Sequence, residues 1–112
     1  MNLRFSEQEL RFRVSKSELE LLCEGSDLKQ CTYLPNGKSL KYIIKADSYR
    51  ESMFLEYEDN QIILHANINY IKEFYDSLPR RDGLETTQTL SKNREIILIL
   101  EVDIRTHKRK RG

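Results

Sequence analysis

The sequence predicts an α+β domain in which a mainly antiparallel sheet of about five to six strands carries two helices on one face. The chain has 112 residues, which is room for a single hydrophobic core. Several segments alternate apolar and polar residues and are joined by short polar turns, as is typical of antiparallel neighbours. Two other segments repeat apolar residues at helical spacing. We expect residues 1–104 to form this domain and residues 105–112 to form a disordered basic tail.

The first clear strand has apolar residues at alternate positions with two arginines between them. It runs through Leu10, Arg11, Phe12, Arg13 and Val14. This alternation indicates one buried face and an outer face that carries the arginines. The polar residues 6–9 form either the turn of a small hairpin, with an earlier strand around Leu3 and Phe5, or a bulge.

Two helices are predicted by their start signals and their apolar spacing. Residues 15–18 read Ser-Lys-Ser-Glu, which is a capping box, and Gly25 is suited to end that helix. Asn67 or Asn69 caps a second helix, which Pro79 closes.

The segments between the helices are expected to form an antiparallel meander. Asn36-Gly37 is the strongest hairpin signal in the chain, because both residues tolerate the positive φ of a type I′ turn. Asp59-Asn60 predicts a second tight turn. The expected strands cover residues 28–34, 40–47, 53–58 and 62–66.

The C-terminal third is predicted to be a long loop followed by a buried strand. Residues 80–93 are polar with few apolar anchors, which indicates a functional or disordered loop. Residues 94–103 contain an unbroken apolar run, which favours a strand in the middle of the sheet. No internal repeat is evident in the sequence.

The charge is distributed unevenly along the chain. The formal net charge is +1, but five of the last eight residues are Lys or Arg and none is an acid. The basic residues are Arg105, Lys108, Arg109, Lys110 and Arg111. Such a tail either keeps the last strand soluble, lies over the acidic body, or contacts a polyanion.

Metal and cofactor sites are not expected. Cys23 and Cys31, with His65 and His107, lack the paired short spacings of a zinc site. The cysteines are expected to be buried free thiols, although the sequence leaves a disulfide between them open. The glycines are too scattered to form a phosphate-binding loop. With no apolar run of membrane-spanning length and no signal segment, we expect a cytoplasmic protein.

The leading functional hypothesis is a non-enzymatic module that binds a protein partner, or a second copy of itself as a homodimer, through an uncovered sheet face. The candidate contact residues on that face are Arg11, Arg13, Lys41, Ile43, Lys45 and Phe54. Apolar residues at outward positions, which a monomer rarely exposes together, favour this hypothesis. They are Ile43, Phe54, Ile63, Ile97 and Ile99.

Two alternatives use charged residues. Basic and aromatic side chains on a sheet, together with the basic tail, would bind nucleic acid or another polyanion. Alternating carboxylates would hold a metal in an enzyme, although cross-strand ion pairs explain them better. These carboxylates are Glu56, Glu58, Glu101 and Asp103. His65 is expected to be a solvated strand residue, and no catalytic residue is assigned.

Four segments together resemble a family of small bacterial proteins of unknown function. They are LRFRVSKSELELLCEG, LKYIIKAD, LEYEDNQIILHANINYIKEFYDSL and REIILILEVD. The family opens with an arginine-bearing strand and a Ser/Thr-x-Ser-Glu helix start, and the resemblance runs from Leu3 to Asp103. Its members continue into a Phe-x-Cys-Leu segment and an acidic tail, whereas this chain has Ile104 and a basic end. The resemblance implies a fold and a cytoplasmic location but no mechanism.

Overall fold

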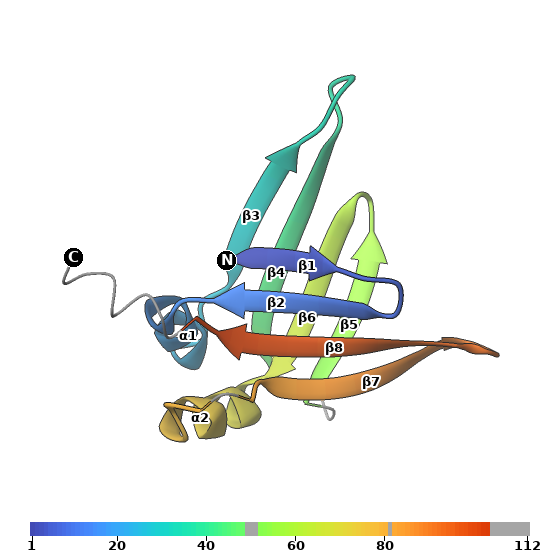
Figure 1. Ribbon diagram of the computed structural model, residues 1–112. Coiled ribbons are helices and arrows are strands. Elements are labelled where there is room, and N and C mark those ends of the chain that lie inside the picture. Colours follow the sequence, from blue (N-terminus) through green and yellow to red (C-terminus); the bar gives the residue numbers. More distant parts are fainter. Residues whose placement is uncertain (49–51, 81, 104–112) are drawn as a thin grey trace.

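The computed structural model describes residues 1–48, 52–80 and 82–103 as an α+β fold (Figure 1). These residues form two four-stranded sheets and two helices. Sheet A has the strand order β1-β2-β8-β7, and sheet B has the order β3-β4-β6-β5. The elements are β1 (Asn2–Phe5), β2 (Glu9–Val14), α1 (Lys16–Cys23), β3 (Leu28–Tyr33), β4 (Ser39–Asp47), β5 (Met53–Glu58), β6 (Gln61–Asn67), α2 (Ile68–Asp76), β7 (Leu84–Ser91) and β8 (Arg94–Val102). The predicted tail at 105–112 lies outside the described residues.

The expectation of one mainly antiparallel sheet is wrong, because the strands form two mixed sheets. Each sheet consists of two antiparallel hairpins joined through a central parallel pair, β2 with β8 and β4 with β6. The predicted meander fails at β4, whose neighbour is β6 rather than β5. The turns that close the hairpins are local signals, whereas the pairing between hairpins is decided by packing across the whole chain.

The predicted loop over residues 80–93 is also wrong, because it contains β7, which pairs antiparallel with β8. Thr86 and Gln88 lie opposite Leu98 and Ile96, so two inward positions of this strand are polar. The apolar alternation that marks a half-buried strand is therefore missing from the sequence.

The local signals for turns and caps are confirmed. Ser15 and Glu18 form the full capping box, and Asn67 rather than Asn69 caps α2. Both residues of the Asn36-Gly37 turn have positive φ, as a type I′ turn requires. The early polar segment is the turn of a real β1–β2 hairpin, closed by a 3.0 Å hydrogen bond from the Ser6 amide to the Glu9 carbonyl.

The hydrophobic core lies between the two sheets. Figure 1 shows the strands of sheet A crossing those of sheet B, with both helices at one corner of the sandwich. The helices do not cover a sheet face alone, since they contact β3, β4 and β6 of sheet B while sheet A also packs on the inner side of that sheet. The fully buried residues come from both sheets and both helices. They include Phe12, Leu19, Leu22, Ile44, Leu64, Ile71, Phe74 and Leu100.

The topology contains an internal duplication that the sequence did not reveal. Each half of the chain forms a hairpin, a helix and a second hairpin, first as β1-β2-α1-β3-β4 and then as β5-β6-α2-β7-β8. Each sheet combines the first hairpin of one half with the second hairpin of the other. Equivalent positions carry buried residues of different types, so the match escapes a comparison of letters. The pairs Phe12/Leu64, Leu19/Ile71 and Leu22/Phe74 are each separated by the same number of positions.

Both cysteines are free thiols in the structure, and Cys23 at the end of α1 is half-buried. Burial raises the pKa of the Cys23 thiol, and the nearby Asp76 carboxylate adds to this effect. Because only the thiolate reacts with alkylating reagents, we expect Cys23 to react more slowly than a small free thiol at pH 8. Iodoacetamide labelling of a Cys31→Ser variant, followed by mass spectrometry, measures this rate. A rate equal to that of the free thiol would contradict the prediction.

Candidate functional site

Three arginines gather on the outer face of sheet A. Along β2 the inward residues are buried, so the intervening Arg11 and Arg13 point away from the core. Arg4 on β1 lies opposite Arg11, and Glu101 on β8 lies opposite Arg13. The hairpin and the parallel β2–β8 pair thus bring together side chains from both ends of the chain.

Two carboxylates hold two of these guanidinium groups. Arg11 donates to Glu101 at 2.8 Å and to Glu9 at 2.9 and 3.2 Å. Arg13 Nε lies 3.4 Å from the other Glu101 oxygen but makes no hydrogen bond, although it is buried. The hydrogen bonds that Arg11 donates to Glu9 and to Glu101 raise its pKa above the ordinary value, so it remains a cation. Three guanidinium groups therefore meet only two carboxylates in this cluster.

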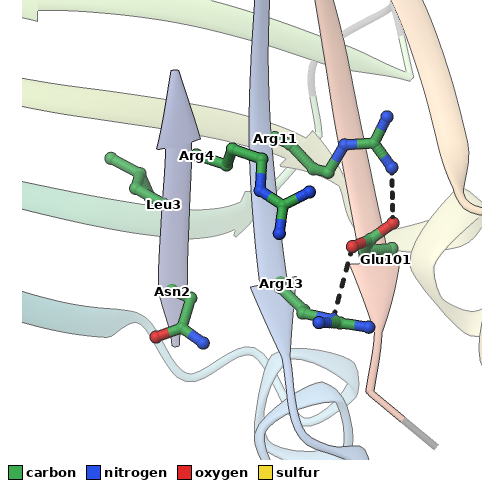
Figure 2. Close-up of a pocket in the computed structure, with 6 residues that line it drawn as sticks. All are labelled: Asn2, Leu3, Arg4, Arg11, Arg13 and Glu101. Carbon is green, nitrogen blue, oxygen red and sulfur yellow. Dashed lines mark hydrogen bonds and ion pairs between the residues drawn. The ribbon is translucent and has the colours of Figure 1, made fainter. Parts of the chain in front are cut away.

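The arginines surround a cavity of about 260 Å³. It is lined by Asn2, Leu3, Arg4, Arg11, Arg13 and Glu101. Figure 2 shows the guanidinium groups of Arg4, Arg11 and Arg13 gathered on one face of the sheet, with Glu101 joined to Arg11 and Arg13. Arg4 is exposed, and no ion pair of Arg4 occurs among the residues that the structure describes. The cavity thus combines one unneutralised guanidinium with two that are only partly neutralised. We call Arg4, Arg11 and Arg13 the arginine cluster.

The predicted contact surface is split between two faces. Arg11 and Arg13 lie on the outer face of sheet A. Lys41, Ile43, Lys45 and Phe54 occupy outward positions of sheet B instead. Because the inner faces of the two sheets share one core, their outer faces point in opposite directions. No single partner surface includes the whole predicted set.

The expected apolar patch is not exposed as predicted. Ile43 and Ile99 are each only 8% exposed, although they lie outside the central core cluster. Arg11 and Glu85 lie on either side of Ile99 in the register, and such long side chains cover apolar neighbours with their stems. The other three outward residues, Phe54, Ile63 and Ile97, are half-buried.

His65 was expected to be solvated, and this expectation is wrong. It is 7% exposed on the outer face of sheet B, where Phe54 lies beside it. Its Nδ1 lies 2.7 Å from Asp47 Oδ2, and its Nε2 lies 2.8 Å from Glu56 Oε1. The ring satisfies both carboxylates when each nitrogen carries a hydrogen. This cluster ties β4, β5 and β6 together.

The paired carboxylates are divided in the same way. Glu56 and Glu58 belong to sheet B, whereas Glu101 and Asp103 belong to the β8 end of sheet A. Glu56 contacts His65 and Glu101 contacts two arginines, so both already have basic partners. Within residues 1–48, 52–80 and 82–103, no group of three or more His, Cys, Asp or Glu residues is placed to hold a metal.

The whole chain was also compared with known proteins. The model of a family of unknown function, DUF7009, matches residues 1–111. The chain belongs to DUF7009. No curated protein and no solved structure matches it significantly. In the described part of this DUF7009 protein, no helix is long and apolar enough to cross a membrane.

Two features of this site in the DUF7009 protein are not indicated by the sequence, namely the contribution of Arg4 and the partners of Glu101. Arg4 lies in a strand of four residues, too short to show an alternating pattern. Its only signal was its place in a hairpin opposite Arg11, if residues 6–9 were taken as a turn. For Glu101 the sequence favours a cross-strand ion pair over a metal site but does not name the partner, because the parallel pairing with Arg13 depends on which distant strand lies beside β2.

Proposed function

We propose that this protein is a binding module, not an enzyme, and that the outer face of sheet A recognises an anionic group of its partner. The observation that carries the proposal is the convergence of three guanidinium groups on one cavity with only two neutralising carboxylates. Guanidinium groups donate paired hydrogen bonds to carboxylate or phosphate oxygens, which suits them to bind such groups. The second sheet and the helices leave this face uncovered (Figure 1).

The equivalent face of sheet B supports the assignment by contrast. The internal duplication places Glu56, Ile63 and His65 where sheet A has Arg4, Arg11 and Arg13. On that face Ile63 is apolar, and the His65 ring contacts the carboxylates of Glu56 and Asp47. The arginine cluster is therefore not a consequence of the shared architecture, since the same backbone positions carry different chemistry in the other half.

An NMR titration with inorganic phosphate and with glutamate tests the proposal. We expect saturable shifts of the Arg4 and Arg13 Nε–H signals that weaken with salt. An Arg4→Ala/Arg13→Ala variant should lose at least about tenfold in affinity, because charge-assisted hydrogen bonds each contribute about 1.5–3 kcal/mol. A Lys41→Ala/Lys45→Ala variant removes the same charge from the opposite face and serves as the control. Equal losses in the two variants, or shifts that never saturate, would refute a site on sheet A.

Glu101 offers a prediction of opposite sign. The Glu101 carboxylate contacts Arg11 and Arg13 and would compete with a bound anion for them. We therefore expect Glu101→Gln to strengthen phosphate binding about three- to tenfold, because it removes this negative charge. Glu85→Gln is the matched control, since Glu85 lies on β7 of the same sheet but does not line the cavity. Its effect should stay below about twofold, as for an exposed charge at a distance. Weaker phosphate binding in Glu101→Gln would mean that Glu101 helps to build the site.

A further inference from the structure

The edge of sheet A next to the arginine cluster is open. β1 is an edge strand and pairs only with β2. The hydrogen bond from the Ser6 amide to the Glu9 carbonyl sets the alternation along this hairpin. Along a strand, the backbone N–H and C=O groups of residues two positions apart point the same way. The backbone groups of Arg4 therefore point toward β2, and those of Leu3 and Phe5 point away from β2 toward the open edge. In the described residues, neither Leu3 nor Phe5 has a partner for these outward backbone groups.

The other half of the molecule shows how the same edge is occupied. Leu55 on β5 is the counterpart of Leu3 in the duplication, with Leu64 opposite it as Phe12 is opposite Leu3. The Gln88 side chain reaches Leu55 from β7, accepting from its amide at 2.6 Å and donating to its carbonyl at 3.0 Å. One amide group thus binds that edge as a neighbouring strand would.

The β1 edge lacks this cover. In the second hairpin of each half, equivalent residues are matched by their place in the strand, and Thr32 is the fifth residue of β3 as Gln88 is the fifth residue of β7. The Thr32 hydroxyl instead bonds the Tyr42 hydroxyl at 2.8 Å. The backbone N–H and C=O of Leu3 are therefore placed to pair with an amide group, as those of Leu55 pair with Gln88, but no residue of the described chain supplies that amide. An unpaired edge of this kind is a template for a further strand.

The side chains beside this edge select the chemistry of an added strand. On the outer face, Arg4 is unneutralised and lies next to Arg11 and Arg13. A residue of the added strand that lies opposite Arg4 would pair with it best if it carried a carboxylate. On the other face of β1, Phe5 is 59% exposed and Leu3 is half-buried, so alternate residues of the added strand would meet apolar surface.

From these contacts we infer that the β1 edge binds an extended acidic segment of a protein partner, which adds a fifth strand to sheet A. This inference rests on the proposed anion-binding function and names its partner class. A second copy of this chain fits less well, because pairing β1 with β1 would place two arginine clusters side by side on one sheet.

The test measures binding of an acetylated and amidated peptide of alternating glutamate and valine. Leu3→Pro removes the outward amide without touching the β1–β2 ladder, a change that edge strands tolerate. Leu3→Ala keeps the amide and is the matched control for the lost side chain. We expect Leu3→Pro to weaken binding at least about tenfold relative to Leu3→Ala. Equal affinity of the two variants would overturn the inference.

Hydrogen exchange in the unmodified protein keeps the test decisive if Leu3→Pro fails to fold. Saturation with the peptide should slow exchange of the Leu3 and Phe5 amides, which are unprotected before binding. Saturation without this protection would overturn the added strand. Protection that grows with protein concentration alone would assign the edge to a second copy, contrary to the inference. If phosphate still binds the arginine cluster while the peptide does not bind, only the strand inference falls; if neither binds, the proposed function falls as well.

Discussion

Replacing Phe12 by alanine is expected to lower the free energy of unfolding by about 3–5 kcal/mol. Phe12 lies on β2 at the centre of the core, with no exposed surface, and pairs with Leu100 of β8. The substitution removes apolar surface from the core and leaves a cavity between two sheets, whose paired backbones limit how far the walls can collapse. Urea denaturation followed by circular dichroism measures the loss.

Phe5→Ala provides the matched control, because Phe5 lies in the same hairpin but is 59% exposed. Its effect should stay below about 1 kcal/mol. The dependence on urea concentration should be similar in both variants if only the folded state is affected. Comparable losses in the two variants would mean that the core does not lie between the sheets.

The second large effect is expected at His65. His65→Leu should lower the free energy of unfolding by about 1.5–3 kcal/mol, because it removes hydrogen bonds to two carboxylates. Asp47 is the more affected of the two, since its Oδ1 is already buried without a hydrogen bond. Both carboxylates keep partial contact with water, which limits the loss.

A double-mutant cycle separates this cluster from a general effect of adding leucine to a strand. Adding Glu56→Gln to His65→Leu should recover part of the lost stability, since Asp47 then no longer faces a second negative charge. Thr87→Leu on the outer side of β7 is the surface control and should change stability by less than about 0.5 kcal/mol. If the two substitutions at residues 56 and 65 were simply additive, the contacts between these side chains would contribute nothing to folding.

The His65 cluster and the arginine cluster illustrate how one duplicated architecture carries two surfaces. Both sit on the outer face of a central strand, β6 in one sheet and β2 in the other. In sheet B the carboxylates come from β4 and β5 and enclose a buried ring. In sheet A an arginine remains unneutralised at an open edge. The difference between a closed face and a binding face therefore depends on a few outward side chains.

Much of the local structure was predictable because its signals lie within a few residues of one another. The capping box at Ser15, the type I′ turn at Asn36-Gly37 and the inward alternation of β2 each depend on neighbouring residues only. Each was predicted from the sequence and confirmed in the structure. The family of unknown function to which the chain belongs likewise agrees with the resemblance in the sequence.

Whatever depends on distant pairing could not be predicted in the same way. β7 carries polar residues at inward positions and is a strand because β8 lies beside it. Glu101 reaches the arginines because β8 runs parallel to β2, from the opposite end of the chain. The sequence by itself thus determined the hairpins closed at Asn36-Gly37 and Asp59-Asn60, the helix caps and the inward face of each of its clearly alternating strands. Only the tertiary structure decided which hairpins share a sheet and which charges meet, because those pairings are set by the burial of one common core.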